Sequence, residues 1–278
     1  MRELLRPWPD LAGEPIVPLG TGWDNLAVSV GAWVLRFPRR QLGADLLDVE
    51  RRWLPALAAK LPVPVSAPER VGEPTETYPW RYAGYRRIEG RTGCTPLLDG
   101  ATRARLAAPL AAFLRALHAL PAPADAPADG LRRADLAHRA PGLRAILARR
   151  DDGRRLGAVL DALVPTEPWG GAPVWVHGDL HPRHVIVAPS GALAGVIDWG
   201  DMHAGDPALD LAIAFTFLPA DARATFRAAY GPIDGATWDR ARFRALHYGA
   251  HLTRYGQTVG DLGMQLVGER ALRASARR

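Results

Sequence analysis

The segment VWVHGDLHPRHVIVAPSGALAGVIDWGD, residues 174–201, contains short apolar runs that end close to acidic residues. Apolar, β-branched runs bounded by Gly, Pro and Asp are typical of short strands joined by turns. Asp179 follows the first run, and Asp198 follows the run at 193–197. If the strands that precede these residues pair with each other, both carboxylates lie at the same end of a small sheet, with His184 between them in the sequence.

Patterns elsewhere indicate strands first and helices later. Residues 16–38 alternate as the two strands of a hairpin with its tip at Gly31-Ala32 and a glycine-bearing turn, LGTGWDN, at its other end. One apolar stripe predicts a helix over about 44–60. Pro55 should kink or interrupt this helix, because proline lacks the backbone N–H that continues the hydrogen-bond pattern.

Helical patterns dominate the remainder of the chain. They cover residues 101–120 and 131–164, and they return after Pro207. The order of elements is therefore a β-rich region, helices, a small β segment and helices again. This order favours an α+β protein with two lobes. We expect a β-sheet N-lobe over residues 1–88 and a larger, mostly helical C-lobe over residues 89–278.

Composition excludes several classes of protein. No window approaches eighteen consecutive apolar residues and the N-terminus lacks a signal-peptide pattern, so we expect a cytoplasmic protein without a membrane partner. The single cysteine, Cys94, excludes an intramolecular disulfide and a cysteine-based zinc cluster. The net charge of +6 comes from scattered arginines without a long cationic run, which argues against a nucleic-acid partner and suggests an anionic small ligand.

Two converging acids with a third ligand between them suit Mg²⁺ and a general base. Phosphoryl transfer uses these two roles: one Asp accepts the proton of the acceptor hydroxyl, and the other holds the metal that bridges the nucleotide phosphates. The protein-kinase pattern has H-R-D, an Asn five residues after that Asp, and then D-F-G. Here the matching residues are His177-Gly178-Asp179, then His184, and then Asp198-Trp199-Gly200.

The stretch HGDLHPRH, followed by GVIDWGDMHAGDPALDLA, resembles the aminoglycoside phosphotransferase family of kinase-like enzymes. In the first part of the chain, LGTGWDN and WVLRFPRR are similar to the branch that holds macrolide and certain aminoglycoside phosphotransferases. The resemblance implies a two-lobed protein-kinase-like fold and the transfer of a γ-phosphoryl group to a small-molecule hydroxyl. It also implies ATP or GTP as the donor and Mg²⁺, with Mn²⁺ as an alternative.

The resemblance assigns roles to residues of both lobes. Asp179 would be the catalytic base and Asp198 a metal ligand, with His184 as a second ligand. His177 and Asp210 would support the catalytic loop. The nucleotide-binding residues would be Gly20, Thr21 and Gly22 over the phosphates, Arg36 with Glu50, and the backbone of Arg86 and Ile88 at the purine edge.

Arg36 departs from the family pattern, which has a lysine in this strand. Lys60 is the only lysine in the chain, so an arginine must take that role. Glu50 supports the assignment independently, because it lies on the apolar stripe of a helix, where an unpaired carboxylate is costly. Arg36 is the nearest candidate partner on a neighbouring element. The exchange changes the chemistry, since Arg presents a planar fork and Lys a point charge.

His184 is the second departure, because the family has Asn at this position. An imidazole is a softer ligand than an amide oxygen and favours later metals. Three functions therefore stay open: phosphorylation of an antibiotic such as an aminoglycoside or macrolide, phosphorylation of a choline-, homoserine- or sugar-like metabolite, or nucleotide binding with weak or no transfer. We expect a monomer or a homodimer with a nucleotide and a small-molecule acceptor as its partners.

Overall fold

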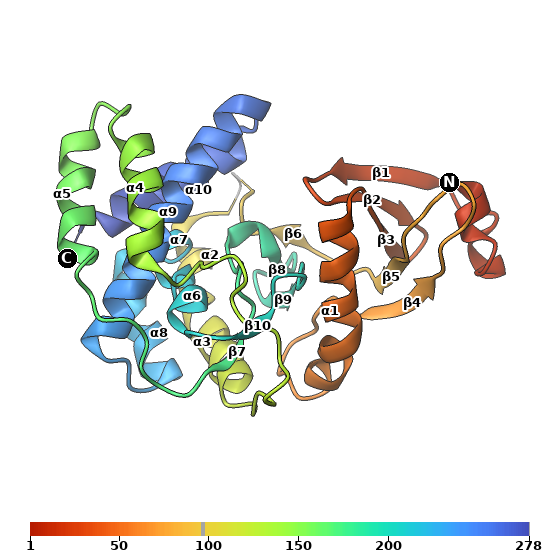
Figure 1. Cartoon of the computed structure of the whole chain (residues 1–278), viewed down its shortest axis with the longest axis horizontal. Helices are drawn as coiled ribbons and strands as arrows, with labels where there is room; N and C mark the ends of the chain where they lie inside the picture. Colours follow the sequence, from red (N-terminus) through yellow and green to blue (C-terminus); the bar gives the residue numbers. More distant parts are fainter. Residues whose placement is uncertain (96–97, 278) are drawn as a thin grey trace.

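The computed structural model describes residues 1–95 and 98–277 and consists of two lobes (Figure 1). The N-lobe contains an antiparallel sheet in the order β1-β2-β3-β5-β4. Its strands are β1 (Ile16–Thr21), β2 (Asn25–Val30), β3 (Trp33–Pro38), β4 (Pro68–Gly72) and β5 (Tyr82–Arg86). The expected α+β class and the sheet-bearing first lobe are confirmed, and the boundary at residue 88 stays a prediction.

The predicted hairpin tip is correct. Val30 pairs with Trp33, so Gly31 and Ala32 form the two-residue turn between β2 and β3. Gly31 has a φ of +55°, which glycine adopts without the steric cost that a Cβ atom would bring. This tight turn fixes the register of β3 and therefore the face on which Arg36 lies.

Helix α1 (Gln41–Ala58) lies between the N-lobe sheet and the C-lobe (Figure 1). The helix continues through Pro55, so the expected interruption does not occur. Leu54 and Leu57, on either side of this proline, are buried in the main hydrophobic cluster of the C-lobe. Burial of these side chains stabilises the last turns against the loss of one backbone hydrogen bond at Pro55.

The C-lobe is mostly helical, as expected. Its core gathers large buried side chains such as Phe113, Trp175 and Trp199. Its helices are α2 (Gly100–Arg105), α3 (Ala107–His118), α4 (Leu136–Leu147), α5 (Gly153–Leu163), α6 (Ala208–Leu211), α7 (Ile213–Thr216), α8 (Arg223–Tyr230), α9 (Gly235–Val259) and α10 (Leu262–Ser275). Its strands are β6 (Arg91–Thr92), β7 (Val174–Val176), β8 (Val185–Val187), β9 (Leu193–Val196) and β10 (His203–Gly205).

The strands that precede Asp179 and Asp198 do not pair with each other, so the condition considered for the sequence is not met. Strand β7, before Asp179, pairs with β10, whereas β9, before Asp198, pairs with β8. The turn that contains His184 brings the two acids together. The His184 carbonyl accepts a hydrogen bond at 2.9 Å from the N–H of Ile197, the residue just before Asp198. Strands β8 and β9 are consecutive and joined by a short connection, residues 188–192, and strands joined in this way usually pair with each other.

The expected helical segments differ from the structure in two details. The helix expected over 101–120 breaks at Leu106, between α2 and α3. The helices expected over 131–164 are present as α4 and α5, but the first begins later, at Leu136, where the carboxylate of Asp135 accepts the His138 N–H at 2.8 Å and caps the first turn. None of the helices in the described part of the chain is both long and apolar enough to cross a membrane.

Candidate active site

Asp179 lies in a loop that begins where β7 ends. Gly178, just before it, has a φ of +80°, and a Cβ atom there would lie 2.4 Å from the Asp201 carbonyl oxygen. Only glycine fits this position. The carboxylate of Asp210, at the start of α6, accepts the N–H groups of His177 at 2.7 Å and Gly178 at 3.0 Å. The expected support of the loop by Asp210 is thus visible as two buried hydrogen bonds.

The carboxylate of Asp210 is buried and strongly stabilised in its ionised form. His118 Nε2 lies 3.2 Å from its Oδ2 atom. Burial alone would raise the pKa of Asp210, but the His118 contact, with a smaller contribution from His177, lowers it. An ionised acceptor of this kind holds the loop before Asp179 most firmly at neutral pH.

Replacing Asp210 by Asn should destabilise the fold by about 2 kcal/mol at pH 7, because an amide offers one acceptor oxygen where the carboxylate offers two. A carboxylate with a lowered pKa contributes stability above its unfolded pKa of about 3.9 and loses it as pH falls through the folded value. The difference between variant and wild type should therefore shrink below about pH 4. Urea unfolding of the variant and the wild type at pH 7 and below about pH 4 measures the difference in free energy of unfolding. The same difference at both pH values would contradict the ionised state assigned to Asp210.

Cationic and phenolic groups surround the Asp179 carboxylate. The Tyr248 hydroxyl donates to Oδ1 at 2.5 Å, Arg244 lies 3.4 Å from the same oxygen, and His181 Nε2 lies 3.7 Å from Oδ2. Burial would raise the pKa of Asp179, but the charge of Arg133 and then the nearby histidines lower it to about 2. Asp179 is therefore a carboxylate over the whole neutral range.

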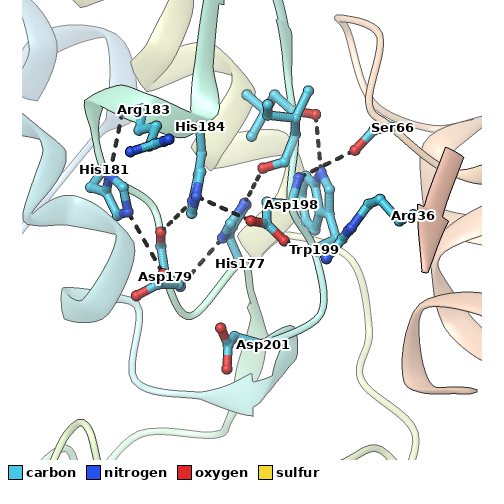
Figure 2. A network of polar contacts seen from close by, with 12 residues as sticks. Arg36, Ser66, His177, Asp179, His181, Arg183, His184, Asp198, Trp199 and Asp201 are labelled. Carbon is cyan, nitrogen blue, oxygen red and sulfur yellow. Dashed lines mark hydrogen bonds and ion pairs between the residues drawn. The ribbon is translucent and has the colours of Figure 1, made fainter. Parts of the chain in front are cut away.

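Asp198 lies at the end of β9, opposite the N-lobe (Figure 2). Its φ of +67° is unusual for a residue other than glycine, although Asp tolerates this region better than most. The Asp198 N–H donates to Ser66 Oγ at 3.2 Å, which ties this backbone to the segment before β4. Local backbone strain of this kind is often found at functional sites.

Arg36 links the two lobes through two carboxylates. Its guanidinium group donates to Glu50 Oε1 at 2.9 Å and to Asp198 Oδ1 at 2.8 Å. Glu50 has 1 % of its side chain exposed, and its other oxygen accepts the Tyr85 hydroxyl at 2.6 Å. The pairing of Arg36 with Glu50 that the helix pattern predicted is present. Burial outweighs Arg36 and raises the pKa of Glu50. Burial would also raise the pKa of Asp198, but Arg36 and His184 together lower it well below its usual value.

His184 lies between the two acids (Figure 2). Its Nδ1 atom is 2.9 Å from the Asp179 carbonyl oxygen, and its Nε2 atom is 3.3 Å from Asp198 Oδ2. A histidine whose Nδ1–H donates to a carbonyl presents Nε2 in the orientation that metal-binding histidines use. Two ligands on adjacent corners of an octahedron lie about 3 Å apart, so the Asp198 and His184 donors fit one divalent cation.

A second set of donors overlaps the first. One ligand atom each from Asp179, His181 and His184 lies within 4.8 Å of the others. The His181 and His184 rings are also close, with centroids 4.0 Å apart. His184 belongs to both sets, which makes it the histidine best placed to bind a metal.

The remaining nucleotide-binding candidates lie apart from this centre. Gly20 and Thr21 end β1, and Gly22 follows in the turn before β2, where its N–H donates to the Asn25 carbonyl at 2.8 Å. Arg86 ends β5 and pairs through its side chain with Glu69, and Ile88 follows it. Within the described residues, no hydrogen bond or ion pair joins these positions to Asp179 or Asp198. Their contact with a nucleotide stays a prediction.

Sequence reasoning missed several residues of this centre. Tyr248 and Arg244 reach Asp179 from α9, nearly seventy positions along the chain, and Arg133 pairs with Asp201 at 2.8 Å. The available signal was weak, because the segment around Tyr248 has the pattern of an ordinary amphipathic helix.

A sequence model of the phosphotransferase enzyme family matches residues 15–246, which is most of the chain. The chain belongs to this family. The family resemblance expected from the motifs is therefore confirmed, and the motif acids at Asp179, Asp198 and Asp210 all lie within the matched region.

Solved structures of kinase-like phosphotransferases have the same fold as this family member. The GDP complex of aminoglycoside 2'-phosphotransferase-IIIa has a TM-score of 0.71 at 23% identity, covering 98% of this chain and 96% of that one. The macrolide 2'-phosphotransferase MphH from Brachybacterium faecium has a TM-score of 0.57 at 23% identity, with 97% and 98% covered. The two-lobed protein-kinase-like fold is confirmed.

A curated relative shares only part of the family member's sequence. The uncharacterized protein YcbJ of Bacillus subtilis (strain 168) is 31% identical over 70 residues. This match covers 25% of the chain and 23% of the length of YcbJ. It therefore adds no information on the acceptor.

Proposed function

We propose that this family member transfers the γ-phosphoryl group of ATP or GTP to a hydroxyl of a small molecule, in the cytoplasm. The observation that carries the proposal is the pair of ionised acids joined by one histidine: His184 contacts the Asp179 carbonyl through Nδ1 and the Asp198 carboxylate through Nε2. This arrangement supports the proposal, because phosphoryl transfer uses one carboxylate for the acceptor hydroxyl and a second as a metal ligand.

Asp179 would bind and orient the acceptor hydroxyl. Its Oδ1 atom already accepts from Tyr248, so Oδ2 is the oxygen available to the acceptor. With a pKa of about 2, Asp179 is a weak base before the reaction. Phosphoryl transfer passes through a loose transition state in which the hydroxyl proton leaves late, so orientation contributes more than early proton removal.

Asp198 and His184 would hold the divalent cation, and Arg36 would stabilise the phosphates while Glu50 fixes its position. Bound there, Mg²⁺ or Mn²⁺ supplies positive charge that neutralises the phosphate oxygens. Arg36 already contacts Asp198, so the guanidinium lies beside the expected position of the phosphates. Its planar fork can donate to two oxygens of a phosphate at once.

The identity of the acceptor separates two enzymatic candidates. A screen with radiolabelled ATP and GTP over antibiotics and over choline-, homoserine- and sugar-like alcohols tests transfer directly. Expression in a sensitive host tests whether antibiotics are inactivated in cells. Transfer to an aminoglycoside or macrolide with a rise in resistance would favour an antibiotic phosphotransferase, and transfer to a metabolite alone would favour a metabolite kinase. No transfer to any acceptor would favour a nucleotide-binding module.

Replacing His184 by Asn tests the metal site. An amide oxygen is a harder ligand than imidazole and suits Mg²⁺ better. Exchange of one group around a metal changes the affinity for that metal by about 10–100-fold. We therefore expect the Mg²⁺-supported rate of the variant to rise about tenfold relative to its Mn²⁺-supported rate. Initial rates at matched concentrations of both metals measure this ratio. An unchanged ratio would remove His184 from the metal site.

A further inference from the structure

We infer that the acceptor carries an anionic group, a phosphate or a carboxylate, next to the hydroxyl that is phosphorylated. The inference rests on the proposed function, because it names the substrate class of the same site. The binding surface for this group is the basic cluster, which we define as Arg133, Arg139, Arg244, His247 and His251.

Helix α9, which reaches Asp179, and its neighbour α4 contribute arginines but few acids. Helix α4 contains no Asp or Glu, and α9 contains none after Asp239. The helices pack on each other through buried side chains that include Leu143 and Leu246. Arg139 of α4 and Arg244 of α9 are therefore held on neighbouring elements, and close enough that repulsion from Arg244, after burial, contributes to lowering the pKa of Arg139.

Two side-chain nitrogens of the basic cluster are buried with no hydrogen-bond partner among the described residues. These are Arg244 Nε, which is always a donor, and His247 Nδ1, whose role depends on the tautomer. Arg244 is 4 % exposed. Arg139 donates to the backbone carbonyls of Arg132 and Leu131 and forms no ion pair with any described residue. Unsatisfied buried donors are costly, so a ligand with acceptor oxygens would satisfy them.

Acids pair with two of the arginines in the basic cluster. Asp179, the carboxylate assigned to the acceptor hydroxyl, pairs with Arg244, and Asp201 pairs with Arg133, whereas Asp129 accepts the Ala134 N–H. The pKa of His247 falls to about 2, first through burial and then through repulsion from Arg244, His251 and the other arginines. His247 is therefore neutral, and Arg139 is the one arginine of the basic cluster without an ion pair among the described residues. An unpaired cation beside Arg133 and Arg244 favours an anionic group over the ammonium groups of an aminoglycoside.

The test uses inorganic phosphate and kanamycin as probes. Each is titrated by calorimetry into the full chain saturated with a non-hydrolysable ATP analogue and Mg²⁺. The variants are Arg139→Glu and the milder Arg139→Gln, with Arg154→Glu on α5 as the matched control, because Arg154 is exposed and outside the basic cluster. Thermal unfolding of every variant shows whether the fold is retained.

We expect phosphate to bind the wild type and to bind Arg139→Glu about tenfold or more weakly, with Arg139→Gln between them and Arg154→Glu unchanged. We expect kanamycin not to bind the wild type. The inference would be overturned by equal phosphate binding in all four proteins, by no phosphate binding, or by kanamycin binding more tightly than phosphate. Failure of the proposed function is distinguishable, because the ATP analogue itself would then not bind in a metal-dependent way.

Discussion

Replacement of Asp179 by Asn is expected to lower the rate of phosphoryl transfer by about 10²–10⁴-fold. Asn cannot accept the hydroxyl proton, and its amide would present a donor where Tyr248 or the acceptor now donates. The affinity for nucleotide should stay unchanged, because Asp198, His184 and Arg36 are separate from the replaced carboxylate. Steady-state kinetics and nucleotide titrations of the same preparations measure both quantities.

A matched exchange serves as the control for this result. Asp161 is an exposed acid on α5 that pairs with Arg144 at the surface, and Asp161→Asn should change neither the rate nor the affinity. If Asp179→Asn turned over as fast as the control, Asp179 would have no role in transfer. If it lost nucleotide affinity as well, the carboxylate would belong to the metal site with His181 and His184.

The second large effect is expected at the Arg36–Glu50 pair. Replacing Arg36 by Met leaves the buried Glu50 carboxylate with Tyr85 as its one remaining partner among those named above. Breaking a buried ion pair on one side costs about 3–5 kcal/mol. Glu50 would escape part of this cost by binding a proton, so the loss of stability should grow as pH rises from about 5 to about 8. Urea unfolding across this range measures the effect.

The double variant Arg36→Met with Glu50→Gln is the control for that prediction. It removes both charges, and a neutral amide can still accept from Tyr85, so most of the stability should return. Metal-dependent nucleotide affinity should not return, since the guanidinium beside Asp198 is still absent. A double variant as unstable as the single one would show that packing of Arg36, and not its charge, stabilises the lobe.

Local patterns predicted the parts of this site that depend on neighbouring residues. Glu50 on an apolar stripe required a cation, and Arg36 was the cation within reach, which the structure confirms. The spacing from Asp179 to His184 likewise predicted that the histidine would lie close to Asp179, and its Nδ1 atom is 2.9 Å from the Asp179 carbonyl oxygen. The cost of an unpaired buried charge limits the partners that Glu50 can have, and the short spacing limits how far His184 can lie from Asp179.

Long-range contacts could not be predicted in the same way. The pairing of β7 with β10 instead of β9 depends on which short strands pack best in the C-lobe, and each is too short to carry its own register signal. The approach of Tyr248 and Arg244 to Asp179 depends on how α9 packs, which helical periodicity alone does not reveal. The continuous helix through Pro55 is a case in which tertiary burial overrides local preference.

The central claim is that this family member breaks the β–γ phosphate bond of a bound nucleotide with the help of a divalent cation. Phosphorus NMR of ATP or GTP, incubated with stoichiometric protein and either Mg²⁺ or Mn²⁺, tests it most directly. We predict slow conversion to the diphosphate that requires the cation and is abolished in Asp198→Asn. Nucleotide that is bound equally with and without the cation, and that remains intact in both, would contradict the claim.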